Sequence, residues 1–314
     1  MRSELHGTER AFSHQALFYR NARDYQAGAV PFVLDGLARD QPVAVAVPAR
    51  QRRLLASTLG LLAQDVEFIE MEEVGRNPGR LLPAVLQAFV DQHAGQTCRI
   101  LGEPVWSGRS AEEYPACVQH EALVNLAFEG RTADLLCPYD VAALGPEVVR
   151  DVEATHPSIL DADGHEVRQS TRYAPDEAYE RYNEPLFAPA DVPVVAFDIE
   201  TLAAARRAAT EFAARCGTTE ARLADLALAV GEVCANSVQH GGGHGELAVW
   251  SRDDMVVCQV SDRGRLLDRL AGRRLTSVQQ YDGRGLYLVH QVADLIRTHV
   301  ADDGLTTHIH LRRT

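Results

Sequence analysis

Three polar residues near the C-terminus of the chain recur at every fourth position: Glu232, Asn236 and His240. At 3.6 residues per turn these side chains span about 80° of a helix circumference, and the other side of the same helix is apolar. A carboxylate that can act as a base, an amide oxygen that can hold a metal ion and a terminal polar group therefore line one wall of a predicted pocket. Taken alone, the pattern also fits an amphipathic helix with a solvated face.

The limits of this helix are predicted from capping residues and glycines, and the strands after it are predicted from alternating apolar and polar residues. Thr218 or Thr219 can cap its start, and the three glycines at 241–243 end it. Two segments of alternating apolar and polar residues follow, 247–251 and 255–260, and they predict a pair of strands joined by a polar turn.

Asp262 follows the second of these strands on the same side as the apolar Val256 and Val260. Its side chain should therefore point inward, where an unpartnered carboxylate costs several kcal/mol. A ligand with an exocyclic amine would provide a partner. A charge-assisted hydrogen bond of roughly 1.5–3 kcal/mol would select such a base.

A pair of glycines, Gly283 and Gly285, opens the next predicted helix. Glycines at a helix start let backbone N–H groups approach phosphates, and the helix dipole attracts the anion. By itself such a pair is weak support for a phosphate site. The chain is then predicted to finish with two strands, 296–301 and 306–312, with the hydroxyls of Thr306 and Thr307 at the start of the last one.

The order of these parts resembles the Bergerat-fold ATPases, the superfamily of gyrase, the Hsp90 chaperone, histidine kinases and MutL. Glu232 at the first motif position looks like the anti-sigma-factor serine kinases, because histidine kinases usually carry His there. The resemblance covers about residues 192–314 and implies an α+β two-layer fold that binds ATP and Mg²⁺. It implies that Glu232 is the general base, that Asn236 holds Mg²⁺ and that Asp262 binds the adenine amine. The other nucleotide-binding residues that we infer are His240, Gly264, Gly283, Arg284, Gly285, Leu286, Thr306 and Thr307.

Two features depart from that family. Its adenine-binding turn usually reads DxGxG, whereas Arg265 and Leu266 follow Gly264 here. The segment 265–282, which has no helical or strand period, is a short lid. Both departures favour nucleotide binding over efficient phosphoryl transfer, so kinase turnover is the weaker expectation.

Composition narrows the classes of protein further. The chain has no lysine, so all 31 basic residues are arginine, which excludes a lysine-bearing phosphate loop and Schiff-base chemistry. A net charge of −13 argues against direct nucleic-acid binding and suits a basic protein partner. The six cysteines show no CxxC pair and are expected to be reduced core residues of a cytoplasmic protein. No apolar run reaches membrane length.

The first half of the chain alternates short apolar runs with helical stretches, which predicts an α/β domain with a mainly parallel sheet and helices on both faces. The apolar runs are 42–47, 66–69, 98–102 and 133–137, and the helical stretches lie near 22–39, 50–61, 78–94 and 110–129. Polar residues at the carboxyl ends of such strands are candidates for ligand binding.

Several motifs of this half resemble the MEDS sensory domain, over roughly residues 10–160. They include the segment 14–19, the run 99–104, and Cys137 with Pro138, Tyr139 and Asp140. The resemblance implies a RecA-like sheet that senses a small organic signal, here without a phosphate loop. The candidate sensory residues are His14, Tyr19, Glu103, Trp106, Glu121 and Tyr139. Each of them also fits an ordinary structural role, as a hydrogen-bonded histidine, a core aromatic or a solvated charge.

We therefore expect a MEDS-like sensory domain at 10–160, a proline-rich linker at 161–191 with one short helix at 176–183, and an ATPase domain at 192–314. Together the resemblances imply a regulator of transcription in stress responses. It would sequester a sigma factor and phosphorylate a serine of an anti-anti-sigma (STAS) partner. A non-enzymatic, nucleotide-modulated adaptor and a sensor histidine kinase-like protein are the alternatives. The oligomeric state stays open, although this kinase family commonly forms dimers.

Overall fold

The computed structural model describes residues 12–161, 166–274 and 284–314. Their contacts divide the chain into two compact units. The first comprises the residues up to Gly75 together with Ala88–Ala178, and the second comprises Arg76–Gln87 together with Tyr179–Thr314. The change of unit after Ala178 falls within the predicted linker. The predicted domain limits at 160 and 192 stay predictions.

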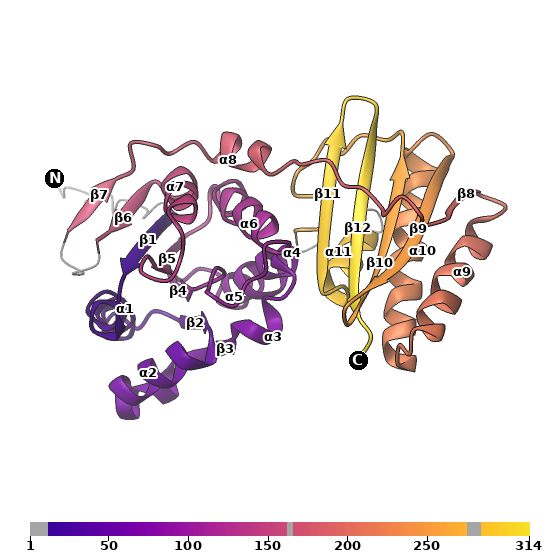
Figure 1. Ribbon diagram of the computed structural model, residues 1–314. Coiled ribbons are helices and arrows are strands. Elements are labelled where there is room, and N and C mark those ends of the chain that lie inside the picture. The colour runs from indigo at the N-terminus through magenta and orange to yellow at the C-terminus, as the bar shows by residue number, and fades with distance from the viewer. Residues whose placement is uncertain (1–11, 162–165, 275–283) are drawn as a thin grey trace. The chain divides into compact units, whose positions relative to one another are not determined.

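The first unit is built on a seven-stranded sheet with the order β3-β2-β4-β5-β1-β6-β7 (Figure 1). Neighbouring strands run parallel, except that β7 is antiparallel to β6. The strands are β1 (Ser13–Tyr19), β2 (Val43–Val47), β3 (Glu67–Glu70), β4 (Cys98–Gly102), β5 (Ala133–Asp140), β6 (Ser158–Leu160) and β7 (Val167–Gln169). The helical segments are α1 (Ala22–Ala38), α2 (Ala49–Leu59), η1 (Gly60–Asp65), α3 (Met71–Val74), α5 (Ala88–Gln92), α6 (Tyr114–Ala127) and α7 (Pro146–Thr155), and α8 (Pro175–Arg181) follows at the boundary.

Successive side chains of β1 point into two different cores, because a strand has a period of two. Leu17 belongs to a buried cluster that includes residues of α1 and α2. Ala16 belongs to another that includes residues of α6 and α7. Helices therefore cover both faces of this mostly parallel sheet, as the alternation of the sequence predicts.

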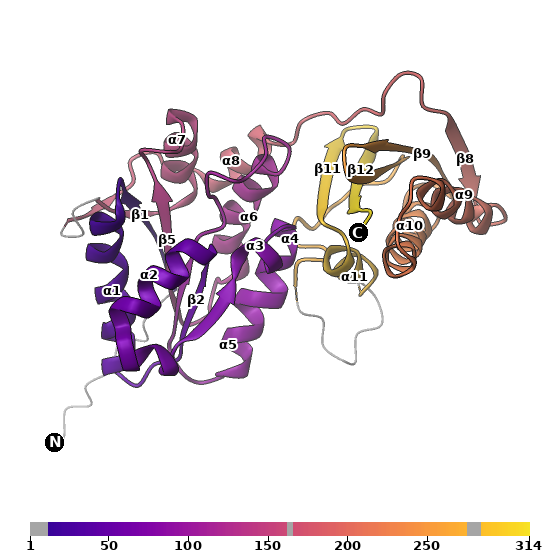
Figure 2. The same ribbon diagram turned by 60° about the horizontal axis from the view of Figure 1, so that its bottom comes forward.

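The second unit contains a five-stranded antiparallel sheet with the order β11-β12-β10-β9-β8. One face of this sheet shares a single buried core with α9, α10 and α11, and Figure 2 shows these helices together on that side. The strands are β8 (Val194–Asp198), β9 (His244–Arg252), β10 (Met255–Asp262), β11 (Leu295–Ala301) and β12 (Gly304–Arg312). The helical segments are α4 (Pro78–Leu81), η2 (Leu82–Gln87), α9 (Leu202–Arg215), α10 (Glu220–His240) and α11 (Arg284–Val292). The result is the two-layer α+β arrangement expected of this half.

The helix predicted from the spacing of its polar residues is α10, with Thr219 at its N-cap and Gly241 at its C-cap. It has 21 residues. Within the described ranges, no helix combines the length and the apolar character needed to cross a membrane.

One expectation about the first half is confirmed with a local change of helix type, and another is wrong in detail. The chain is helical over 78–92 as expected, but it passes from α4 through the π-helical segment η2, which contains Pro83, into α5. Proline has no N–H for the regular α-helical bond, which accounts for the interruption. The strand expected to end at Cys137 continues to Asp140, so Tyr139 lies inside β5 and not beyond its end.

The core around Leu17 gives a test of this architecture. Leu17 is fully buried, and α1 packs so closely on it that a Cβ on Gly28 would lie 2.5 Å from Leu17 Cδ1. We expect Leu17→Ala to lower the free energy of unfolding by about 2–5 kcal/mol, since the cavity cannot fully collapse. Urea titration measures this loss. The control Leu61→Ala, at a side chain that is 87% exposed, should change it by less than about 0.5 kcal/mol.

Candidate nucleotide-binding site

The start of α11 lies directly against Glu232 of α10. A Cβ added to Gly285 would overlap with Glu232 Oε2, so only a glycine leaves the carboxylate in its present position. Glu232 and Asn236 are both half-buried on α10. The predicted base thus stands beside the backbone N–H groups of a helix N-terminus, which is where a phosphate group would bind.

Asp262 lies at the end of β10 and points toward α10, as the alternation predicts. Its Oδ2 accepts a hydrogen bond from Ser237 Oγ at 2.6 Å, and its Oδ1 accepts one from the backbone N–H of Gly264 at 2.6 Å. These two bonds hold the carboxylate in a fixed orientation and leave lone pairs on both oxygens for a ligand amine.

Two glycines permit this close approach between the end of α10 and the turn after β10. A Cβ on Gly264 would lie 2.7 Å from Asp262 Oδ1 and 3.1 Å from Gly241 Cα, and a Cβ on Gly241 would lie 2.5 Å from Asp262 Cγ. The backbone N–H of Arg263 also donates to Gly241 O at 3.2 Å. Gly264, predicted as a binding residue, therefore has a structural reason to be glycine.

The remaining predicted residues are placed unequally around these contacts. Thr307 lies on the helix-covered face of β12 with Ile309, whereas the Thr306 hydroxyl lies 3.3 Å from Ser261 Oγ on the opposite face. His240 is exposed at the end of α10, and Arg284 and Leu286 are half-buried in the first turn of α11. Gly283 lies outside the described residues.

Ser237 is a site residue that sequence reasoning missed. It is buried, and it lies one position after Asn236 on the side of α10 that faces the core. A hydroxyl among apolar neighbours needs a hydrogen-bond partner, and this was the signal that could have led to it. Nearby, burial and then the charge of Asp262 raise the pKa of the Cys234 thiol to about 12, so this cysteine is a neutral thiol and not a nucleophile.

Comparison with known families agrees with this geometry. Residues 195–312 match the family described as "Histidine kinase-like ATPase domain", and residues 13–157 match the family described as "MEDS: MEthanogen/methylotroph, DcmR Sensory domain". The chain carries a MEDS domain followed by a histidine kinase-like ATPase domain. An ATPase domain of this kind implies nucleotide binding.

Matches to whole proteins are distant. No curated protein matches the chain. Among solved structures, the chain is similar to the Acinetobacter baumannii histidine kinase AdeS, with 10% sequence identity over 39% of this chain and 68% of that one, and with a TM-score of 0.25.

Three of the predicted sensory residues meet in the MEDS domain, on the face of the sheet that α6 and α7 cover. His14 Nε2 lies 3.1 Å from Glu121 Oε2, and the Tyr139 hydroxyl donates to Glu121 Oε1 at 2.7 Å. All three side chains are buried. Cys137 and His156 join them, although neither was among the predicted site residues.

Burial acts strongly on the charges of this group. Burial raises the pKa of the Glu121 carboxyl, but its contacts with His14, His156 and His120 outweigh burial and lower this pKa to about 2. Burial, assisted by the neighbouring His14, lowers the pKa of His156 to about 3. The group therefore contains a buried carboxylate and a neutral His156 imidazole.

Tyr19 and Glu103 form a second, separate pair with Gln51. The Tyr19 hydroxyl donates to Glu103 Oε1 at 2.7 Å, and Gln51 Nε2 donates to the Tyr19 hydroxyl oxygen at 3.2 Å. Burial raises the pKa of the Glu103 carboxyl to about 8, in spite of the Tyr19 hydrogen bond. Trp106 is with neither group: its ring stacks under the guanidinium of Arg109, 4.0 Å from the ring centroid. The six candidates thus do not form one site.

The contact at Gly285 generates a prediction about turnover. The atom that a new Cβ would meet is the end of a flexible side chain, so Gly285→Ala should fold but displace the Glu232 carboxylate. We expect phosphoryl transfer or ATP hydrolysis to fall by about ten- to a hundredfold, as for a general base moved by about 1 Å. Steady-state rates measure the change. The control Gly231→Ala, whose Cβ would lie 3.3 Å from the flexible Arg206 Cδ, should leave the rate unchanged.

The buried Glu103 generates a prediction about pH. Its pKa of about 8 in the folded chain exceeds the ordinary value of 4.5, so the native state keeps the proton that the unfolded chain releases. The free energy of unfolding should therefore fall by up to about 1.4 kcal/mol per pH unit between these two values, and level off above them. Glu103→Gln removes this loss, so it should be more stabilising near about pH 8 than near about pH 5.

Chemical unfolding of wild type and variant at both pH values checks this. The exposed Glu129→Gln serves as the control and should show an equal effect at both. A Glu103→Gln effect that is independent of pH would contradict the buried, protonated acid.

Proposed function

We propose that this chain is an ATP- and Mg²⁺-dependent regulator of the anti-sigma type, whose ATPase domain phosphorylates a serine of a STAS partner. The observation that carries the proposal is the contact of Glu232 with Gly285, because it puts a carboxylate beside the place where a terminal phosphate group would lie. In this assignment Glu232 takes the proton of the attacking hydroxyl, and Asn236, one turn later on α10, supplies an oxygen ligand to Mg²⁺. Phosphoryl transfer needs mainly such positioning and charge neutralisation.

The proposed base-binding residues support the same nucleotide. Asp262 is held by Ser237 and by the Gly264 N–H, and it can accept a hydrogen bond from the exocyclic amine of adenine. Guanine would present a carbonyl oxygen at the corresponding position, which a carboxylate repels. ATP is therefore the proposed cofactor, with Arg284 at the start of α11 as the proposed cation near the phosphates.

Sequestration of a sigma factor, competition by the STAS protein and sensing of a small organic signal by a RecA-like MEDS domain complete the proposed regulator. The net charge of −13 suits a basic protein surface as partner. A non-enzymatic adaptor is the second candidate. Leu266, which stands where the family usually has the second glycine of the adenine-binding turn, favours it.

Two variants of α10 separate these candidates. Asn236→Ala should abolish Mg²⁺-dependent ATP binding in calorimetry, because it removes a metal ligand. Glu232→Gln should keep binding within about threefold and lower transfer of the labelled γ-phosphate to a STAS protein by at least about a hundredfold. The exposed Glu220→Gln on the same helix serves as the control for both assays.

Binding of ATP without label transfer from the wild-type chain would establish the adaptor. Absence of heat with millimolar ATP and Mg²⁺ would contradict both candidates. Partners for these assays come from co-purification with the full chain, identified by mass spectrometry.

A further inference from the structure

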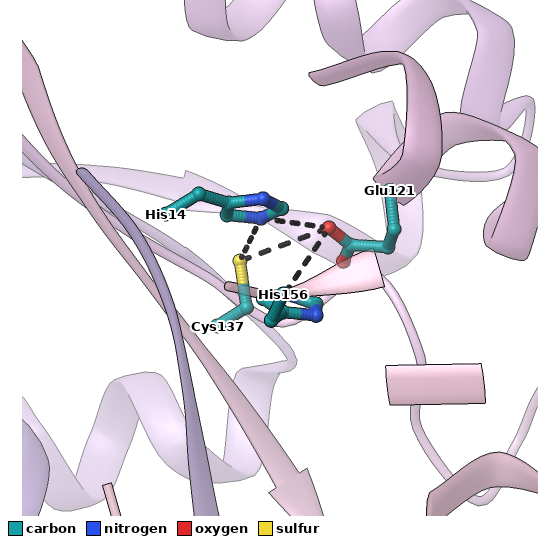
Figure 3. Close-up of side chains that lie close together, drawn as sticks. All are labelled: His14, Glu121, Cys137 and His156. Carbon is teal, nitrogen blue, oxygen red and sulfur yellow. Dashed lines mark hydrogen bonds and ion pairs between the residues drawn. The ribbon is translucent and has the colours of Figure 1, made fainter. Parts of the chain in front are cut away.

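Four potential metal ligands converge in the MEDS domain from four separate elements (Figure 3). His14 comes from β1, Cys137 from β5, Glu121 from α6, and His156 from the residue that follows α7. All four side chains are buried, and their ligand atoms all lie within 4.8 Å of one another. In the chain, His14 and Glu121 are 107 residues apart, so this convergence is a product of the fold.

The spacing of the ligand atoms fits a tetrahedral ion. Bonds of about 2.0–2.3 Å from a zinc ion to nitrogen, oxygen and sulfur put neighbouring ligand atoms about 3.3–3.8 Å apart in a tetrahedron. His14 Nε2 lies 3.1 Å from Glu121 Oε2 and 3.6 Å from Cys137 Sγ. Glu121 Oε2 lies 3.5 Å from His156 Nε2 and 4.0 Å from Cys137 Sγ. The remaining two pairs of ligand atoms lie within 4.8 Å of each other, so shifts of up to about 1 Å would complete the coordination.

The outer hydrogen bonds orient both histidines toward the centre of the group. Asn125 Nδ2 donates to Thr155 O at 2.8 Å and to Glu121 O at 3.1 Å, which identifies Asn125 Oδ1 as the atom that faces His14 Nδ1 at 3.1 Å. This oxygen can only accept, so we assign the proton of neutral His14 to Nδ1.

His156 is oriented in the same way. Its Nδ1 lies 3.0 Å from Val152 O, which also can only accept, so we assign its proton to Nδ1 as well. The Nε2 lone pairs of both imidazoles then point at the carboxylate of Glu121. A carbonyl acceptor behind the remote ring nitrogen is the arrangement that metal-binding histidines use.

With both imidazoles protonated only at Nδ1, none of the four ligand groups carries a positive charge. Two lone pairs, a carboxylate and a thiol face one another in a buried place, where unpaired polar atoms are costly. One added proton on His14 would pair it with Glu121, but His156 Nε2 would still face a carboxylate oxygen at 3.5 Å. A single dication bonded to all four atoms satisfies every one of them. The mixture of imidazole, thiolate and carboxylate selects transition metals over Mg²⁺ or Ca²⁺.

We propose that His14, Glu121, Cys137 and His156 form a binding site for one first-row transition-metal dication, and that Zn²⁺ is the ion that fits these donors best. Tyr139 and Asn125 hold the ligands from outside: the Tyr139 hydroxyl donates to Glu121 Oε1 and Asn125 accepts from His14. A cavity lined by Val118, Glu121, Tyr139 and Val152, among other residues, borders the site. This site is independent of the nucleotide site of the ATPase domain.

The test uses the full chain, stripped of metal with a chelator and then titrated. We expect one equivalent of Zn²⁺ to bind in competition with a chromophoric chelator. At free Zn²⁺ a hundred times the Kd, the midpoint of thermal unfolding should rise by roughly 5–10 °C. Co²⁺ should give the intense visible bands of tetrahedral coordination together with a thiolate-to-cobalt charge-transfer band in the near ultraviolet, which requires Cys137 as a ligand.

Variants locate the site. Cys137→Ser and His156→Gln should weaken Zn²⁺ binding by more than about a hundredfold, and Asn125→Ala by about ten- to a hundredfold. Cys117→Ser is the matched control: Cys117 is buried in the same core cluster, but its Sγ points to Pro104 O at 3.7 Å, so Zn²⁺ affinity should be unchanged. Circular dichroism of each metal-free variant shows whether it has folded.

If Cys137→Ser does not fold, the cobalt spectrum of the wild-type chain still decides the question. A spectrum without the thiolate band overturns the proposal, as does Zn²⁺ binding that Cys137→Ser and His156→Gln leave intact. Failure to take up either ion also overturns it and leaves an ion pair of His14 and Glu121 as the role of the group.

Discussion

The close approach of Gly285 to the carboxylate of Glu232 is the constraint on which the ATPase domain depends. It requires a residue without a side chain at the start of α11, and it fixes how closely α11 approaches α10, with which it shares one buried core. The same approach sets the base against the N-terminal N–H groups of α11, which attract anions. Packing and chemistry therefore impose the same choice of residue.

A second tight contact lies at Asp262, on the base-binding side of the candidate nucleotide site. Gly241 and Gly264 allow the end of α10 to meet the turn after β10, and Asp262 is held between them by Ser237. A carboxylate with two fixed hydrogen bonds loses little freedom when it receives a third partner. The Asp262 carboxylate is thus oriented for a ligand by bonds that exist without one.

Most of the fold could be predicted from the sequence, because the periodicity of apolar residues and the residue types that end helices and strands are local properties of the chain. α10 follows from the spacing of Glu232, Asn236 and His240, and the strands β2 to β5 and β9 to β12 follow from their apolar or alternating runs. The short strands β6, β7 and β8 were not predicted. The sequence did not indicate β1 as an ordinary strand, because most of its residues are buried on both faces and no alternation appears. It also did not indicate the partners of the site residues. Ser237 and Asp262 are 25 residues apart, and Cys137 and His14 are 123 residues apart, so their meeting depends on how whole elements pack.

For the same reason, the six candidate sensory residues fall into two separate groups in the structure, and Trp106 belongs to neither of them. Glu103 lies at the carboxyl end of a parallel strand, as expected. Tyr139 does not, because it lies inside β5, and His14 lies near the start of β1. These two contribute instead to the face that α6 and α7 cover.

The two-sided burial of β1 has a consequence for how this domain can vary. His14 and Tyr19 lie on opposite faces of one seven-residue strand, so a single inserted or deleted residue between them would move the side chains of one half of the strand to the opposite face of the sheet. A change that kept His14 on its present face would move Tyr19 to the wrong face, and the reverse. Length changes should therefore be tolerated in the loops that flank this strand and not within it, and the strand serves as the fixed reference against which both buried groups are aligned.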